Sequence, residues 1–345
     1  MTEPRQSEDG VRTCGGEHGR HVHRIAVLRR APDTRSGAPA APRPRGGAVG
    51  LRLLAAALCG LLALTLTAAV FVRTYPGQWL DGVLLPPAES GGGYEQRTAL
   101  VGPAKTALAT FGNPTLIAAL LGVVLLVGVL RRRLVAGVVG VGMVVCAVLV
   151  AGAVKTQLPR PDLQIESSTT HNSFPSGHVA AATALLLAFL LVLPGWARRW
   201  LAVPGAAGVS VIAAATMIAG WHRFSDVLGG VLLGVTLFLL AAAALAARPT
   251  DHDAAGGSAG GGLWRGLAEA AVGLVVLVWA LVVVVPGLAA SVQRGPLVAI
   301  VAAAVSTMFL VGAVVFLVRS TDFAVPRAVR SPAQPQPSTE ARKIS

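Results

Sequence analysis

The sequence is poor in charged residues. Only 13% of its 345 residues are Asp, Glu, Lys or Arg, whereas 54% are hydrophobic. A soluble domain of this size carries about twice that share of charge, so the composition excludes one. The hydrophobic residues are gathered in runs of about twenty, the length that a helix needs to cross about 30 Å of hydrocarbon. Because backbone groups in lipid must be satisfied within their own segment, these runs predict transmembrane helices.

Cysteine is also scarce, and the three cysteines have no informative spacing. Cys14 lies in a polar tail, and Cys59 and Cys146 lie within hydrophobic runs. This arrangement excludes a disulfide framework and a zinc site. No other metal-ligand spacing is present, so we expect neither a metal nor another cofactor.

Acidic residues are outnumbered by basic ones, 16 to 29, which gives a net charge of +13. Such an excess can indicate nucleic-acid binding. Most of it lies in the terminal tails and in short loops, where Lys and Arg set the orientation of membrane helices. We therefore expect membrane lipids, and no nucleic acid, as partners.

Eight hydrophobic runs predict an all-α fold, a polytopic membrane helical bundle. Six spans form a core at 49–248, and two additional C-terminal spans form an appendage at 264–319 after a flexible Gly-rich linker at 249–263. Residues 1–48 and 320–345 are predicted to be disordered tails, although an overextended start codon is an alternative explanation for the first. The expected spans are 51–72, 114–130, 134–154, 177–193, 200–220, 225–247, 266–287 and 296–318.

The arginines between the spans predict the orientation. Arg131–Arg133 fall on the same side as Arg198 and Arg199 and as both tails, and the positive-inside rule makes that side the cytoplasm of a cell membrane. The outer side receives the segments 73–113 and 155–176 and the turn near Trp221. The aromatic residues of 73–113 are compatible with a short interfacial segment that roofs a site, and equally with an irregular connector.

Three groups of polar residues fall on this outer side. The first is Lys155, Arg160 and Pro161, where the third span ends. An ammonium and a guanidinium side by side suit a phosphate, but they are also typical of basic side chains that snorkel at a helix end. Arginine and lysine on the outer side run against the positive-inside bias, which favours a role in phosphate binding.

The second group is the run Ser173-Phe174-Pro175-Ser176-Gly177-His178, directly before a hydrophobic run. Pro175 and Ser176 are typical of a helix start, and Gly177 allows a ligand to approach the backbone. The free N–H groups and the positive end of the helix dipole favour an anion there. His178 would face that anion from the first turn, although a histidine at an interface can also be simply solvated.

The third group is the run from Trp221 to Asp226. His222 and Asp226 stand four positions apart, so on a helix they face the same way and the carboxylate can accept an imidazole N–H. This fixes the tautomer and leaves the other ring nitrogen free to attack phosphorus. An ion pair at a helix start is the structural alternative, but in a chain with so few charges an ionisable pair at membrane depth is a functional candidate.

Together these motifs resemble the type-2 phosphatidic acid phosphatase family, which also includes soluble vanadium haloperoxidases. The resemblance covers roughly residues 51–247. It implies that His222 is a nucleophile that forms a phosphohistidine, that Asp226 is its partner, and that His178 protonates the leaving oxygen. It also implies phosphate-binding roles for Lys155, Arg160, Ser176 and Gly177.

Two departures from the family pattern affect this assignment. Only four residues separate Lys155 from Arg160, fewer than the family usually has, so this segment must reach the site by a tighter path. The third motif usually carries Ser-Arg ahead of the histidine, whereas this chain has Ala215-Thr216 and therefore lacks one cation. Arg223 is the obvious substitute, and a lipid-headgroup or loop contact is its alternative role.

The sequence thus predicts a metal-independent lipid phosphatase with its site outside, acting on a lipid phosphate such as an isoprenyl phosphate or diphosphate or phosphatidate. Phosphotransfer to an alcohol, a vanadate-dependent peroxidase, and a non-catalytic or transport protein that binds anionic lipid are the alternatives. The sequence leaves open the lipid tail, the mono- or diphosphate preference, the oligomeric state and the role of the last two helices.

Overall fold

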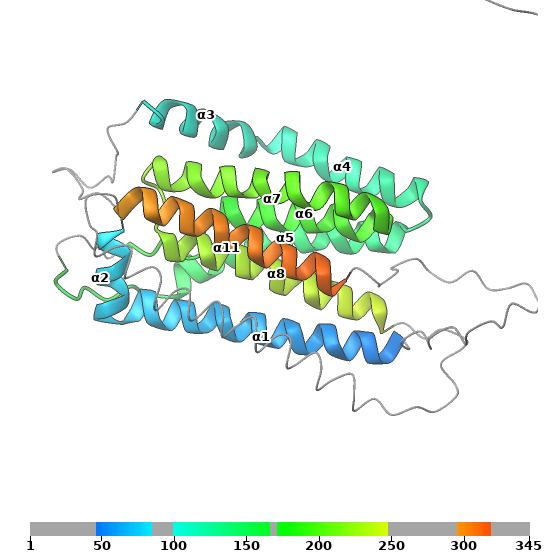
Figure 1. Cartoon of the computed structure of the whole chain (residues 1–345), viewed down its shortest axis with the longest axis horizontal. Helices are drawn as coiled ribbons and strands as arrows, with labels where there is room; N and C mark the ends of the chain where they lie inside the picture. Colours follow the sequence, from blue (N-terminus) through cyan, green and yellow to red (C-terminus); the bar gives the residue numbers. More distant parts are fainter. Residues whose placement is uncertain (1–45, 85–98, 166–170, 248–294, 319–345) are drawn as a thin grey trace, which may run out of the picture. The chain divides into compact units, whose positions relative to one another are not determined.

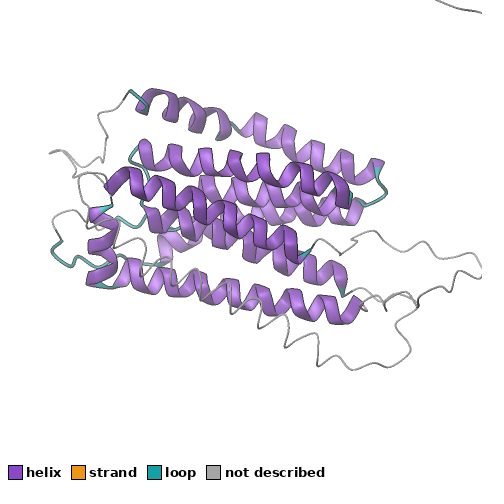
Figure 2. Ribbon diagram, viewed as in Figure 1, coloured by secondary structure: helices purple, strands orange, loops and turns teal. Residues whose placement is uncertain are grey.

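The computed structural model describes residues 46–84, 99–165, 171–247 and 295–318, and every regular element in them is a helix. Figures 1 and 2 show the long helices lying side by side. The helices are α1 (Gly46–Arg73), α2 (Tyr75–Val83), α3 (Val101–Phe111), α4 (Pro114–Leu130), α5 (Leu134–Gln157), α6 (Gly177–Val192), α7 (Gly195–Ile218), α8 (Phe224–Ala246) and α11 (Gly295–Leu317).

The predicted polytopic helical fold is confirmed. Within the described ranges, five helices are long and apolar enough to cross a membrane, namely α1, α5, α7, α8 and α11. The pair α3–α4 makes a sixth if it counts as one bent span, and α6 is a shorter apolar helix. The predicted span 266–287, the linker and both tails lie outside the described residues.

The segment 73–113, expected to be a loop on the outer side, contains two helices. Thr74 caps α2, because its side chain accepts a hydrogen bond from the Gly77 N–H. Asn113 begins α4 in the same way by accepting from the Thr115 N–H, and Pro114 follows at the first helical position. At this break α3 and α4 are bent by 54°.

Helices α6 and α8 form the centre of the hydrophobic core. All but three of the 16 residues of α6 are buried, and α8 packs against α1, α5, α6 and α11. Glycines bring the backbones of α6 and α8 close together: a Cβ at Gly230 would lie 2.7 Å from the Ser176 carbonyl oxygen, and one at Gly234 would lie 2.8 Å from the Thr183 Cβ. Small residues of this kind allow close packing of membrane helices.

The two arginine-rich loops meet at one end of the bundle. Arg133 Nη1 donates to the Leu193 carbonyl at 3.3 Å, and Arg198 Nε donates to the same oxygen at 3.0 Å. The three polar motifs lie at the opposite ends of α5, α6 and α8. The basic end and the motif end of the bundle are therefore separated by the length of α5, about 36 Å for 24 residues.

Candidate active site

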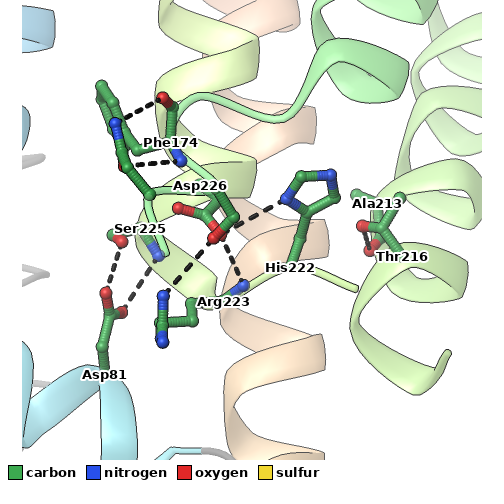
Figure 3. A network of polar contacts seen from close by, with 10 residues as sticks. Asp81, Phe174, Ala213, Thr216, His222, Arg223, Ser225 and Asp226 are labelled. Carbon is green, nitrogen blue, oxygen red and sulfur yellow. Dashed lines mark hydrogen bonds and ion pairs between the residues drawn. The ribbon is translucent and has the colours of Figure 1, made fainter. Parts of the chain in front are cut away.

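The beginning of α8 holds His222 and Asp226 together. Asp226 Oδ2 lies 3.3 Å from His222 Nδ1 and also accepts hydrogen bonds from Ser173 Oγ at 2.5 Å and from the Arg223 N–H at 2.9 Å. Figure 3 shows Asp226 with His222 on one side and with Ser225 and Asp81 on the other. Three donors on one oxygen favour the charged carboxylate. Because Nδ1 is engaged, Nε2 is the His222 nitrogen that can react with a substrate.

The beginning of α6 lies next to this pair. The Ser176 N–H donates to the Asp226 carbonyl oxygen at 2.8 Å, which joins the two helix starts directly. Ser176 is the N-cap residue, but its Oγ is buried and has no hydrogen-bond partner among the described residues. A buried hydroxyl without a partner is costly, so this group is available to a ligand.

Lys155 lies close to the start of α6, and His178 is the second residue of that helix. A Cβ at Gly177 would lie 4.0 Å from Lys155 Nζ, so the ammonium lies over the first turn of α6. His178 is half-buried, and both His222 and Lys155 are among its electrostatic partners. Its ring centroid lies 5.8 Å from that of Trp221. One cation, two imidazoles and a helix N-terminus thus converge on one place, as an anionic substrate requires.

The turn before α6 is held by Asn172, a buried residue. Its Nδ2 donates to the Leu158 carbonyl at 2.9 Å, and its Oδ1 accepts the Phe174 N–H at 3.0 Å. Asn172 therefore ties the segment that carries Arg160 to the segment that carries Ser176.

Both arginines of the predicted site are buried, Arg160 at 4% exposure and Arg223 at 3%. Arg223 Nη1 lies 3.4 Å from Ser173 Oγ, which in turn donates to Asp226. Arg223 is therefore directed into the protein beside the His222–Asp226 pair.

Thr216 occupies the position where the family usually has arginine. Its Oγ donates to the Ala213 carbonyl at 2.7 Å within α7, and the side chain is fully buried. Its carbonyl oxygen accepts the N–H groups of Trp221 at 3.0 Å and of His222 at 3.2 Å. Thr216 thus shapes the turn that carries the histidine and supplies no charge.

Sequence reasoning missed Asp81, a fully buried acid of α2. Its Oδ1 accepts the Ser225 N–H at 3.2 Å, and its Oδ2 accepts a short hydrogen bond from Ser225 Oγ. Burial, and then the charge of Asp226, raise the pKa of Asp81 to about 7. Because Ser225 and Asp81 are 144 positions apart, no local pattern could have linked them.

Within the described ranges, no group of three or more His, Cys, Asp or Glu side chains could hold a metal ion. Histidine, carboxylate, lysine and serine side chains such as those described above are able to act by nucleophilic attack, proton transfer and anion binding.

The fold is that of a polytopic helical membrane protein, and His178 and His222 lie at the starts of two of its helices. Residues 136–250 match the family model of the PAP2 superfamily, so the family predicted from the motifs is confirmed over this part of the chain. Members of this superfamily are in general phosphatases, and the match indicates phosphatase-type activity. The comparisons with curated proteins and with solved structures found no match.

Proposed function

We propose that the protein is a membrane lipid phosphatase that hydrolyses a phosphomonoester or diphosphate of a lipid through a phosphohistidine at His222. The observation that carries the proposal is the contact between His222 Nδ1 and Asp226 Oδ2 beside the start of α6. A histidine held in this way has a fixed tautomer and a nucleophilic nitrogen. Lys155 and the N-terminal N–H groups of α6 are the nearby features that suit a phosphate.

In the first step, the lone pair of His222 Nε2 attacks phosphorus and the bond between phosphorus and the leaving oxygen breaks. Protonated His178 gives its proton to that oxygen, so the lipid alcohol leaves neutral, and the lipid monophosphate from a diphosphate leaves with one negative charge fewer. Asp226 stabilises the positive charge that develops on the His222 ring. In the second step, neutral His178 takes a proton from water, the water oxygen attacks phosphorus, and the P–N bond breaks to release phosphate.

The phosphate is held in this proposal by Lys155, Arg160, Ser176 Oγ and the backbone at Gly177, with Arg223 in place of the missing third-motif arginine. Ser176 is the best-supported member, because its buried Oγ has no partner among the described residues. Arg223 acts from the Ser173 side of the pair, where its Nη1 lies 3.4 Å from Ser173 Oγ.

A lipid substrate fits a site at the helix ends, since its tail can stay in the bilayer while its phosphate reaches the histidines. Isoprenyl phosphates, isoprenyl diphosphates and phosphatidate are the substrate classes to test. The site lies at the end of the bundle opposite Arg133 and Arg198, and the positive-inside rule then directs it away from the cytoplasm. Such a site would serve the recycling or trimming of lipid carriers of the cell envelope.

The proposal is tested by phosphate release from those three substrate classes, with detergent-purified wild-type protein and His222→Ala in parallel. We expect one class to be hydrolysed and the variant to be inactive. Rapid quenching during turnover should also trap acid-labile phosphate on the wild type and none on the variant.

Two other outcomes would redirect the assignment. If lipid phosphate esters of an added alcohol form in place of free phosphate, the protein is a phosphotransferase. If the wild type is inert towards all three classes but binds them, a lipid-binding or transport role replaces the phosphatase. Hydrolysis that a chelator abolishes and magnesium restores would contradict the metal-independent mechanism.

A further inference from the structure

Helix α2 lies outside the region that matches the PAP2 superfamily, yet it contacts two of the three motif segments. Gln78 and Asp81 are both fully buried, whereas Tyr75 and Trp79 are 57% and 51% exposed. Gln78 Nε2 donates to the Pro161 carbonyl at 3.1 Å. Asp81 accepts both hydrogen bonds from Ser225, as described above. The polar face of this short helix is therefore directed into the protein and towards the site.

We propose that α2 completes the catalytic site and that Asp81 is a positioning residue for the His222–Asp226 pair. The inference rests on the proposed function and extends it to a part of the chain that the family motifs do not cover. Asp81 acts through Ser225, the residue directly before Asp226.

The first turn of α8 requires such a partner. The first N–H groups of a helix have no acceptor within the helix, so their position depends on external acceptors. Asp226 supplies an acceptor to the Arg223 N–H, and Asp81 supplies one to the Ser225 N–H. Because Asp226 directly follows Ser225, the hold of Asp81 on Ser225 helps to fix where the Asp226 carboxylate meets His222. A displacement of about 1 Å at a reacting group can cost about 100-fold in rate.

The charges around Asp81 give this contact a second effect. Asp226, Arg223 and Arg160 are the charged groups that interact with it electrostatically. The Asp81 carboxylate favours the burial of both guanidiniums next to the motif segments, since a buried cation needs a compensating charge. Removal of this negative charge should therefore change the environment of the pair as well as the position of the helix start.

The attachment of α2 to α1 is tight enough to be tested separately. A Cβ at Gly77 would lie 2.1 Å from the Val70 carbonyl oxygen and 2.8 Å from the Phe71 Cα. These are backbone atoms that cannot rotate away, so Gly77→Ala must displace α2. This substitution moves Asp81 without altering any charge or any group in the motifs.

The experiment compares the wild type with Asp81→Asn, Asp81→Ala and Gly77→Ala in detergent, with Tyr75→Ala as a matched control on the exposed face of the same helix. Turnover of the best lipid phosphate gives kcat and KM from pH 5 to 9. Calorimetric titration with orthovanadate, whose geometry imitates a phosphoryl-transfer transition state, gives a readout that does not depend on lipid hydrolysis. Thermal unfolding reports the fraction of folded protein.

We expect kcat to fall about 10-fold in Asp81→Asn and about 100-fold in Asp81→Ala and Gly77→Ala, with KM changed less than about 3-fold. Asn keeps the shape of the side chain, so it should rescue part of the loss. The wild-type kcat should also rise with pH through about 7, where Asp81 ionises, and Asp81→Asn should lack this rise. Tyr75→Ala should behave as the wild type does.

A purely structural role predicts lower thermal stability with an unchanged kcat per folded molecule and an unchanged pH profile, and that result would overturn the inference. If the wild type binds orthovanadate but hydrolyses none of the lipids, the proposed function fails by itself. The inference then depends on orthovanadate affinity: a loss of about 10-fold or more in Asp81→Ala and Gly77→Ala supports it, and unchanged affinity overturns it.

Discussion

Asp226→Asn is the most direct perturbation of the proposed chemistry. The Asp226 carboxylate accepts three hydrogen bonds on Oδ2, whereas Oδ1 is buried and has no hydrogen-bond partner among the described residues. An asparagine that keeps its oxygen towards His222 and Ser173 preserves these contacts and removes only the charge. If the asparagine amide is flipped, its NH2 group faces the three hydrogen-bond donors that now point to Oδ2, which is unfavourable. We therefore expect the first orientation and a folded protein.

The magnitude follows from the distance between the two groups. At 3.3 Å, a carboxylate and a positively charged imidazole attract each other by about 5 kcal/mol at an effective dielectric constant of about 20. The amide dipole of asparagine retains part of this attraction. The stabilisation of the positive charge that develops on His222 should therefore be weaker by about 3–4 kcal/mol. Since 1.36 kcal/mol corresponds to a factor of ten, kcat should fall by about 100- to 1,000-fold.

The assay is single-turnover phosphate release with rapid quenching, which separates formation of the phosphoenzyme from its hydrolysis. Ser173→Ala is the matched control, because it removes one donor to the same oxygen and leaves the charge in place. It should cost about 10-fold or less. If Asp226→Asn retained a rate within about 3-fold of the wild type at equal folded content, Asp226 would not be the partner of a nucleophilic histidine.

The packing of two glycines, the ionisation of Asp81 and the expected independence of metal ions can each be tested. Gly230→Ala should lower the melting temperature by several degrees and reduce kcat, because its Cβ would lie 2.7 Å from the Ser176 carbonyl oxygen and push α6 away from α8. An unchanged melting temperature would contradict this packing. Gly112→Ala would place a Cβ 3.3 Å from His178 Nε2. We therefore expect kcat to fall roughly 10-fold, and to fall most for substrates with poor leaving groups. Equal decreases in kcat for all leaving groups would argue against His178 as the general acid. The pKa of Asp81 is raised by burial to about 7, so the folded protein binds this proton more tightly than the unfolded chain does; the stability that this gives is complete below about pH 4 and is lost as the pH rises through about 7. The melting temperature of the wild type should accordingly fall more between pH 5 and 8 than that of Asp81→Asn, and parallel curves would refute the assignment. Finally, hydrolysis should continue in EDTA, as measured by phosphate release with and without added magnesium.

Most of the helices could be predicted because a helix that spans hydrocarbon needs a run of about twenty hydrophobic residues, which is easily seen in a sequence. The run 134–154 became α5, and 225–247 became α8, with ends shifted by a few residues. The short helices α2 and α3 were not predicted. Each is too short to cross a membrane, and α2 mixes buried polar residues with exposed aromatic ones, so its sequence reads as a loop on hydropathy alone.

The site was predictable where its parts are local. His222 and Asp226 are one helical turn apart, and Ser176 and Gly177 begin a helix, so their mutual geometry follows from backbone periodicity. Asp81 was not predictable, because its partner Ser225 lies on a distant segment and only the fold brings them together. Ser173 belonged to a recognised motif, but nothing in the sequence indicated that its hydroxyl would bind Asp226.

The shortness of α6 determines how far its start lies from the end of α5. Its 16 residues span about 24 Å, less than the hydrocarbon thickness of about 30 Å. Gly140 of α5 packs against Ala188 of α6, since a Cβ added at Gly140 would lie 3.1 Å from the Ala188 Cβ. The two helices are antiparallel, so the residue level with Gly177 at the start of α6 is as far beyond Gly140 along α5 as Gly177 is before Ala188 along α6. That residue is Ala151. The start of α6 is thus recessed by about one turn relative to Lys155, whose side chain reaches back to it. Under the proposed function a lipid phosphate must pass the end of α5 to reach the histidines, and we expect this recess to select compact phosphate head groups over bulky ones.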